Sequence, residues 1–448
     1  MMKQTESVSM NSVGIWKCPV KGAWAVLVAI VTAVFGFVAS AAAVADGPLS
    51  WSSGDPPLRG EDRTEQEQLR AVKRILDAFV AESLPEGGID AKKSLWQKPG
   101  TGSASGSSMF PGGVDVRYLR FLVEGLYRVA TLTGDKQYHA VADNHVRFMA
   151  RSMRQDHPTW ALGNALEMIG VYHAFNPREE PLVEKARRIV AWAQQRRVQI
   201  TTVGGVSFRH FPCGYGILNA KDAGWTNDLS MLGSGLVWAY EVTGDKSFLE
   251  DATSFAEYFV QPWQANAAGP AGYWRCGTWR EDLGSWVIGP AHFSGFESTG
   301  AYGDESSWEF STLTCIDYLA RLYRHKPDPR FLDRCVKAAQ WTFRSCQFED
   351  GSVGMCGRDD KWLGLTGDAV TQVVMLRPLL RGQDRSLRPL LEPAVRANRN
   401  LGRWLVRARL EEHGVQWVKR TTSTDPLVNV GMLWTSAVLG WLNGRQLR

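Results

Sequence analysis

Two stretches of the sequence, GLYRVATLTGDKQYHAVA (Gly125–Ala142) and GLVWAYEVTGDKSFLEDA (Gly235–Ala252), are copies of one pattern. Each has the composition of the end of an apolar helix, a Thr-Gly-Asp-Lys turn and the start of an amphipathic helix. A glycine can end a helix in the left-handed conformation, and an aspartate after it can cap the next helix. Weaker copies occur at Tyr172–Ala186 and Tyr323–Ala339, where proline interrupts the helical pattern. The repeat therefore predicts helical hairpins joined by short turns.

Outward from these turns, helices of two kinds alternate along the chain. Amphipathic helices with a charged face, which suit an outer layer, are predicted at about 62–82, 135–153, 180–198, 246–261, 329–346 and 386–409. Helices richer in Gly, Ala, Leu and Met, which suit burial on most sides, are predicted at about 114–132, 158–175, 226–243, 305–325, 365–381 and 427–443. Six such hairpins close into a ring. The sequence thus predicts an all-α fold, an (α/α)6 toroid over residues 62–448 with inner and outer helical layers.

The predicted linkers differ in length according to their direction. Turns from an inner helix to the following outer helix are short, whereas several linkers from an outer to an inner helix are long, near 83–113, 199–225, 262–304 and 347–364. All the long linkers therefore attach at the end of the ring where the inner helices begin. Long loops in a compact fold are usually functional, so we expect an active site at that end.

Polar and aromatic residues gather in the sequence near the predicted starts of the inner helices. Carboxylates and amides beside flat aromatic rings are typical of a sugar-binding cleft. The residues expected to bind substrate are Asp115, Trp160, Arg209, His210, Tyr215, Trp225, Asn227, Trp279, Trp286, Tyr302, Trp308 and Asp368. Each polar residue at a helix start, taken alone, is also explained as a cap, and each tryptophan also suits a small loop core.

Hydrolysis of a glycosidic bond would need one protonated carboxyl as general acid and a second carboxylate as base or nucleophile. The best candidates are Asp228 with Glu305 or Asp304, because these residues open consecutive inner helices. Burial against Trp225 or Trp308 would raise the pKa of the acid partner.

Elimination from a uronate polysaccharide would use different groups. His292, His210 or Tyr302 would accept the C5 proton, and Arg209 or Asn227 would stabilise charge on the substrate carboxylate. A hydrogen-bonded structural role is the alternative for both histidines. The residues alone leave hydrolysis and elimination open.

The ring of hairpins with Thr-Gly-Asp turns resembles the six-hairpin glycosidases and the toroidal polysaccharide lyases. The stretch GGVDVRYLRFLVEGLYRVATLTGDKQY (Gly112–Tyr138) is similar in style to bacterial pectate-lyase toroids. This resemblance implies a carbohydrate-active enzyme that cleaves a polysaccharide or oligosaccharide. A non-catalytic toroid that binds glycans or a partner protein is the alternative from a different class.

A second, local resemblance concerns AAQWTFRSCQFEDGSVG (Ala338–Gly354), which is similar to the glutamine–tryptophan repeat of terpenoid cyclases and prenyltransferases. Val353 stands where that pattern has tryptophan, and the chain has one good copy. A cyclase-like enzyme would require an apolar central cavity that excludes water.

The first 45 residues have the pattern of an export signal. The stretch from Gly22 to Ala45 carries no charge, follows lysines and ends in the small residues Ala43-Val44-Ala45. It predicts a signal peptide cleaved before Asp46, or else an uncleaved N-terminal membrane anchor, followed by a linker at 46–61. Both interpretations place the rest of the chain outside the cytosol, and only the second adds a membrane contact.

Export makes disulfides chemically reasonable for the six cysteines after the leader. Cys213 with Cys276 and Cys346 with Cys356 are the predicted pairs, while Cys315 and Cys335 suit buried thiols equally well. No cysteine or histidine spacing indicates a metal site, and no cofactor motif is present.

The charge balance argues against a nucleic-acid partner. Without the leader, which holds three lysines and one glutamate, the formal net charge falls from +5 to +3, and no Lys/Arg tract is present. Nucleic-acid binding needs clustered basic residues. Weak attraction to an acidic polysaccharide remains compatible with this balance.

Overall fold

The computed structural model describes most of the predicted toroid. The described residues are 63–89, 116–201, 205–211, 226–260, 309–354, 363–407 and 430–447, with Trp274 and the strands β3 (Gly277–Arg280), β4 (Ser285–Ile288), β5 (Arg409–Glu411) and β6 (Gly414–Gln416). The leader predicted at 1–45 and the linker predicted at 46–61 lie outside them. Among the described helices, none is long and apolar enough to span a bilayer.

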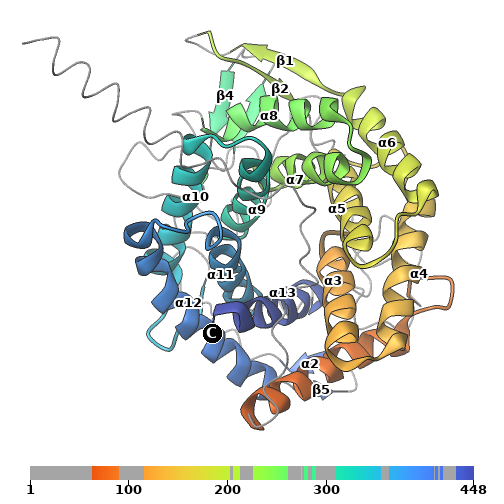
Figure 1. Cartoon of the computed structure of the whole chain (residues 1–448), viewed down its shortest axis with the longest axis vertical. Helices are drawn as coiled ribbons and strands as arrows, with labels where there is room; N and C mark the ends of the chain where they lie inside the picture. The colour runs from red at the N-terminus through yellow and green to blue at the C-terminus, as the bar shows by residue number, and fades with distance from the viewer. Residues whose placement is uncertain are drawn as a thin grey trace, which may run out of the picture. The chain divides into compact units, whose positions relative to one another are not determined.

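Twelve helices of this part of the chain form two concentric rings (Figure 1). The inner helices are α3 (Val116–Thr133), α5 (Thr159–Phe175), α7 (Thr226–Thr243), α9 (Glu309–His325), α11 (Leu363–Leu376) and α13 (Val430–Gly444). Each inner helix packs on the next, and α13 packs back on α3. The inner ring is therefore closed, and the predicted (α/α)6 toroid is confirmed.

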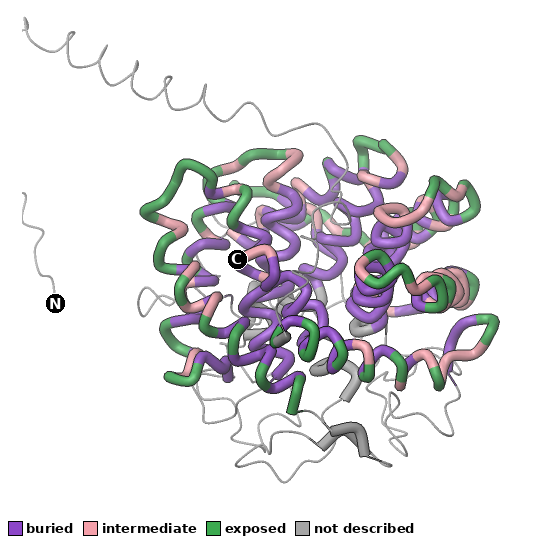
Figure 2. Tube along the Cα trace, turned by 60° about the horizontal axis from the view of Figure 1, so that its bottom comes forward, coloured by how far each residue is buried: buried purple, intermediate pink, exposed green. Residues whose placement is uncertain are grey.

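The outer helices cover the inner ring. They are α2 (Arg63–Glu82), α4 (Lys136–Ser152), α6 (Glu180–Gln194), α8 (Lys246–Val260), α10 (Pro329–Trp341) and α12 (Asp384–Arg407). Between α6 and α8 the chain forms an antiparallel hairpin of β1 (Val198–Thr201) and β2 (Ser207–His210), and β2 packs on α8. Figure 2 shows that the outer helices bury one side and expose the other, as amphipathic helices should.

The two Thr-Gly-Asp turns that predict the hairpins have the same structure. Gly134 and Gly244 adopt left-handed φ values of 73° and 74°. The N–H of each donates to the carbonyl four residues earlier, at 2.8 Å in both turns. Asp135 and Asp245 then accept the N–H of the residue two positions ahead, at 3.0 and 2.9 Å. Each turn ends one helix with glycine and caps the next with aspartate.

Small residues explain how closely the inner helices approach one another. A Cβ atom at Gly163 of α5 would overlap the backbone of α7, and one at Gly235 of α7 would overlap Gly163. Gly367 of α11 and Gly440 of α13 meet in the same way. The glycine content of the predicted inner helices is therefore a requirement of their packing.

The segment that resembles the glutamine–tryptophan repeat follows the outer helix α10 and contacts the outer helix α12. After α10 the chain forms a short π-helix (Thr342–Cys346) and a tight turn closed by the bridge between Gln347 and Val353. The Gln347 side chain donates to the carbonyl of Pro393 at 2.9 Å and accepts from Arg396 at 2.9 Å, so it fastens this turn to α12. A similar bridged turn, from Ser83 to Ile89, follows α2.

Two buried contacts join the first and last described helices. Arg445, in the 3-10 turn η5 (Arg445–Leu447) after α13, forms an ion pair of 2.6 Å with Glu65 of α2. The indole N–H of Trp441 donates to Gln68 of α2 at 2.7 Å. These contacts lock the end of α13 against the helix that begins the outer ring.

The described cysteines, Cys315, Cys335 and Cys346, are all buried, and no disulfide joins any two of them. Burial raises the pKa of the Cys335 thiol well above its usual value. Cys346 forms no disulfide, so the predicted pair of Cys346 with Cys356 is not supported. Cys213 and Cys276 lie outside the described residues, so that pair stays a prediction.

Candidate functional site

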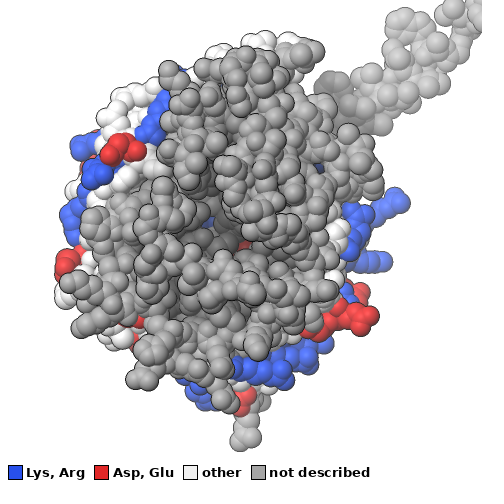
Figure 3. Space-filling view, turned by 180° about the vertical axis from the view of Figure 1, so that it is seen from behind, with Lys and Arg blue, Asp and Glu red and all other residues white. Residues whose placement is uncertain are grey.

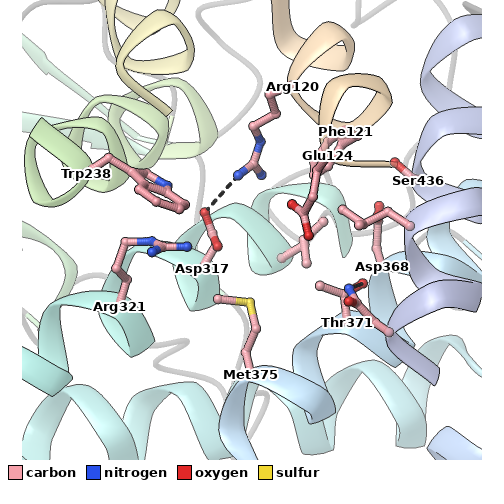
Figure 4. Close-up of a pocket in the computed structure, with 13 residues that line it drawn as sticks. Arg120, Phe121, Glu124, Trp238, Asp317, Arg321, Asp368, Thr371, Met375 and Ser436 are labelled. Carbon is pink, nitrogen blue, oxygen red and sulfur yellow. Dashed lines mark hydrogen bonds and ion pairs between the residues drawn. The ribbon is translucent and has the colours of Figure 1, made fainter. Parts of the chain in front are cut away.

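A cavity of about 30 Å³ lies inside the inner ring (Figure 4). This volume holds about two water molecules and is too small for a sugar ring. Its lining comes from five inner helices: Arg120, Phe121, Glu124, Trp238, Leu313, Asp317, Arg321, Asp368, Thr371, Met375, Ser436, Leu439 and Asn443.

The cavity spans the middle of the ring, with lining residues from Arg120 and Leu313 near the helix starts to Met375 and Asn443 near the helix ends. Arg120 is the fifth residue of α3, Asp368 the sixth of α11 and Asp317 the ninth of α9. At about 1.5 Å per residue, these positions lie roughly 6–12 Å from the helix starts. Figure 3 shows charged atoms at the bottom of a central hollow on the face opposite to that of Figure 1. The cavity therefore lies within reach of the end to which the long linkers attach.

Arg120 is the centre of a buried polar cluster that joins four inner helices. Its guanidinium forms ion pairs with Glu167 of α5, at 2.8 Å, and with Asp317 of α9, at 3.3 Å. The hydroxyl of Ser234 on α7 donates to the same Asp317 oxygen at 2.9 Å. Asp317 therefore holds its carboxylate between a cation and a hydroxyl donor. We call Arg120, Glu167, Ser234 and Asp317 the Arg120 cluster.

A second guanidinium lies beside this cluster. Arg321 stacks on the Trp238 ring, with the guanidinium carbon 3.7 Å from the ring centroid. It also forms an ion pair of 3.3 Å with Glu241, which His325 contacts at 2.9 Å. Stacking on an aromatic face suits the planar guanidinium, so Arg321 is fixed in orientation at the cavity wall.

The opposite wall carries uncharged donors and a carboxyl. Asp368 is 3% exposed, and Ser436 and Asn443 line the cavity beside it. Asn443 donates to the Thr371 hydroxyl at 3.0 Å and accepts from Arg128. Figure 4 shows Asp368 and Asp317 on different sides of the same space.

The buried carboxyls of this region titrate far from their usual range. Burial raises the pKa of Asp368 to about 8, although the Ser436 hydroxyl and the Arg120 charge oppose the shift. Burial likewise raises the pKa of Glu167 to about 7, against the opposing charge of Arg120. At neutral pH Asp368 is therefore mostly protonated and able to donate a proton. A buried carboxyl that keeps its proton near neutral pH suits the role of a general acid.

Of the residues predicted to bind substrate, Asp368 lines this cavity, whereas three others occupy structural positions. Trp160 is 1% exposed at the start of α5, where it belongs to the hydrophobic core. Arg209 on β2 forms an ion pair with the buried Asp251 of α8. Packing accounts for Trp160 and a local ion pair accounts for Arg209, so the structure gives both residues structural roles, and their predicted ligand contacts stay predictions.

His210 was also a candidate, as a base for elimination. It is 1% exposed on β2, stacked beside Tyr258 with ring centroids 6.2 Å apart. Burial lowers the pKa of His210 to about 3, so the ring is neutral. It lies between the hairpin and α8, away from the cavity lining. The structure therefore corrects this candidate to a core residue.

The remaining candidates fall at the edge of the described residues or beyond it. Asn227 and Asp228 occupy the first turn of α7, although their side chains are outside the description. Trp279 and Trp286 are cross-strand partners in the β3–β4 hairpin, with side chains likewise outside it. The other candidates lie outside the described residues altogether: Asp115, Tyr215, Trp225, His292, Tyr302, Asp304, Glu305 and Trp308.

The Arg120 cluster was not predicted from the sequence. Its members lie within the inner helices rather than at their first residues. They are far apart in the sequence: Arg120 and Asp317 are separated by 197 positions. The one available signal was an isolated charge within an otherwise apolar inner helix, such as Glu167 in α5.

Neither a protein-family model nor a curated protein sequence matches the chain. Solved structures do. An α-1,6-mannanase from Salegentibacter sp. HEL1_6 superimposes with a TM-score of 0.58 at 12% identity, covering 85% of this chain and 100% of that one. The unsaturated glucuronyl hydrolase from Bacillus sp. GL1 gives 0.54 at 14% identity, covering 76% and 84%.

The chain has the fold of the six-hairpin glycosidases. At these identities the similarity concerns the (α/α)6 toroid itself, in which inner helices carry the charged cavity described above. The charged lining is also the opposite of the apolar cavity that a cyclase-like enzyme would require.

Proposed function

We propose that the protein is a glycoside hydrolase that cleaves a polysaccharide or oligosaccharide at the end of the ring where the inner helices begin. The observation that carries this proposal is a protonated carboxyl, Asp368, facing the same cavity as an ion-paired carboxylate, Asp317. The toroid neighbours support it: one mannanase structure is an inactive variant in complex with α-1,6-mannotriose.

In this proposal Asp368 is the general acid that protonates the leaving oxygen. The partner is a second carboxylate, and Asp317 fits this position because Arg120 forms an ion pair with it and Ser234 donates a hydrogen bond to it. The cavity holds water but no sugar ring, so the sugar binds above it, toward the helix starts. Asp228 lies six residues before Ser234 on α7, which places it about 9 Å nearer the helix starts. We propose Asp228 and Glu305 as the carboxylates at the entrance to the site.

Hydrolysis is preferred to elimination for a specific reason. Two groups assigned to elimination, His210 and Arg209, are buried or ion-paired in the outer layer. The charged groups that line the cavity are carboxyls and guanidiniums, and paired carboxyls suit acid–base cleavage of a glycosidic bond.

The test is an assay on a panel of polysaccharides that records both new reducing ends and the absorbance of unsaturated uronates. We expect reducing ends without unsaturated products. Asp368→Asn should lower kcat/KM by about 10²–10⁴-fold, the usual contribution of a general acid. Asp317→Asn and Asp228→Asn should reduce turnover similarly.

Asp251→Asn is the matched control, because Asp251 is a buried, arginine-paired carboxylate outside the cavity. It should leave the kcat of the folded protein unchanged. Glycan binding without turnover on any substrate would instead identify a non-catalytic binding toroid, and unsaturated products would identify a lyase.

A further inference from the structure

The outward face of α12 carries a row of arginines at helical spacing. Positions three or four residues apart lie on one side of a helix, and this side of α12 is exposed from end to end. The exposed members are Arg385, Arg388, Arg396, Arg399, Arg403 and Arg407, interrupted by Glu392 alone. We call these six residues the arginine row. It extends over 23 residues, from Arg385 to Arg407, or about 33 Å of helix.

This row corrects the sequence-based expectation that no element carries clustered basic residues. A search for consecutive Lys/Arg tracts does not find it, because two to seven other residues separate successive arginines of the row. Only the helical conformation brings the six side chains onto one face.

In the described part of the chain the arginine row carries no acidic partner, unlike several exposed arginines elsewhere. Arg154, Arg178 and Arg330 each form an ion pair of 3.1 Å or less with a nearby carboxylate. Within the described residues no ion pair involves the row, and the one side-chain bond is from Arg396 to Gln347. Like charges at these spacings destabilise a helix, so helix stability does not explain the row.

A groove extends this basic surface onto the neighbouring helix α2. It has a volume of about 400 Å³ and is lined by Glu67, Arg70, Lys73, Arg74, Asp77 and Val406. Three of these six residues are cationic, and Val406 lies next to Arg407 of the row. Figure 3 shows Lys and Arg side chains gathered along the lower edge, where Figure 1 places α2 and the end of α12.

We propose that the arginine row and this groove bind a linear polysaccharide that carries carboxylate or sulfate groups. Guanidinium groups pair in a bidentate manner with such anions, and a straight row matches the regular spacing of charge along an extended polymer. The groove has the volume of a small-ligand site, and its concave shape does not match a flat bilayer. This site lies on the outer surface and does not rest on the proposed catalysis.

The experiment measures binding of the full chain to fluorescently labelled oligogalacturonate by fluorescence anisotropy, at low and raised salt. The variant Arg399→Glu/Arg403→Glu/Arg407→Glu should weaken binding about tenfold or more, and added salt should weaken binding to the unaltered chain. The matched control Lys136→Glu/Arg188→Glu/Lys246→Glu makes the same charge change at exposed positions of α4, α6 and α8. It should change the Kd less than about twofold.

Equal losses in the two triple variants would overturn the proposal, since they would reflect net charge alone. So would absent binding, or equal binding of uncharged mannan. The α12 variant could instead lose binding to anionic phospholipid vesicles or duplex DNA while it keeps binding to oligogalacturonate. That result would assign the surface to a different partner. A melting temperature for each variant verifies folding, and the readout requires no turnover.

Discussion

Asp368 shows how a single residue acquires a chemical role from its surroundings. An aspartate in water is ionised at neutral pH, but this one is buried on an inner helix and its pKa rises to about 8. The guanidinium of Arg120 opposes that shift without cancelling it. The Asp368 carboxyl therefore stays protonated at a pH where most carboxyls are ionised.

The pKa of Asp368 has a consequence for stability. The folded protein binds this proton more tightly than the unfolded chain, so the stabilisation is complete below the unfolded pKa of about 4 and is lost as the pH rises to about 8. Asp368→Asn cannot titrate. We therefore expect the melting temperature of the unaltered protein, relative to this variant, to fall between about pH 4 and pH 8 and then level off.

A constant difference in melting temperature across that range would contradict the raised pKa. Because Glu167 titrates in an overlapping range and is present in both proteins, the comparison isolates Asp368. If Asp368 is the acid, turnover should also decline above about pH 8.

Removing Arg120 would leave two buried carboxylates without their counter-charge. Arg120 neutralises Glu167 and Asp317, both of which are buried. Arg120→Ala should therefore lower the free energy of unfolding by about 3–5 kcal/mol, the usual cost of breaking a buried ion pair from one side. Urea unfolding measures this, with the exposed Arg188→Ala as control, expected within about 0.5 kcal/mol of the unaltered protein. Similar values for the two variants would show that the Arg120 cluster contributes little.

At the scale of single elements, the hairpin turn is the unit that organises the chain. The turns at Gly134 and Gly244 repeat the same φ, the same backbone bond and the same aspartate cap. Local chemistry of this kind is visible in the sequence, because it depends on four consecutive residues. This is why the hairpins could be predicted.

Gly244→Ala tests the turn by itself. An added Cβ has no atom within 4 Å, so the cost comes from placing an L-residue at φ 74°, roughly 1–2 kcal/mol. Thermal unfolding should show this loss, and Gly244→Asn should lose less, because asparagine tolerates the left-handed region. Equal stability of the alanine variant and the unaltered protein would show that the turn relaxes to another conformation.

The element boundaries were predicted less well than the elements. The outer helix expected at 180–198 ends at Gln194, because Val198 already belongs to β1. The helix expected at 329–346 is α-helical only to Trp341 and continues as a π-helix. In both places the amphipathic pattern continues while the backbone geometry changes, and periodicity cannot distinguish the two.

At the scale of the whole molecule, the closed ring could be predicted but the cavity could not. Six alternating hairpins suffice to indicate a toroid. The convergence of Arg120, Glu167 and Asp317 depends on how far each inner helix is rotated and shifted, which the packing of the ring decides. Sequence reasoning selected helix starts and aromatic loops, where polar residues stand out, and therefore identified Asp368 but not its partners.

The whole chain also carries the predicted export signal, which remains a proposal. We propose that residues 1–45 are removed before Asp46, given the small residues Ala43-Val44-Ala45. Expression in a secreting host followed by N-terminal sequencing should give a mature chain that begins Asp-Gly-Pro. Recovery of the intact N-terminus in the membrane fraction would instead identify an anchor.

The contacts of Arg445 and Trp441 with α2 can form only after α13 has been synthesised, so the ring closes late in synthesis. A ribosome releases α13 after every other described helix, and until then α2 and α3 lack their final neighbours. During synthesis the apolar surface that α13 covers on α3 and α2 therefore stays exposed until α13 has emerged. Premature termination before α13 (Val430–Gly444) would leave an open arc rather than a slightly smaller ring.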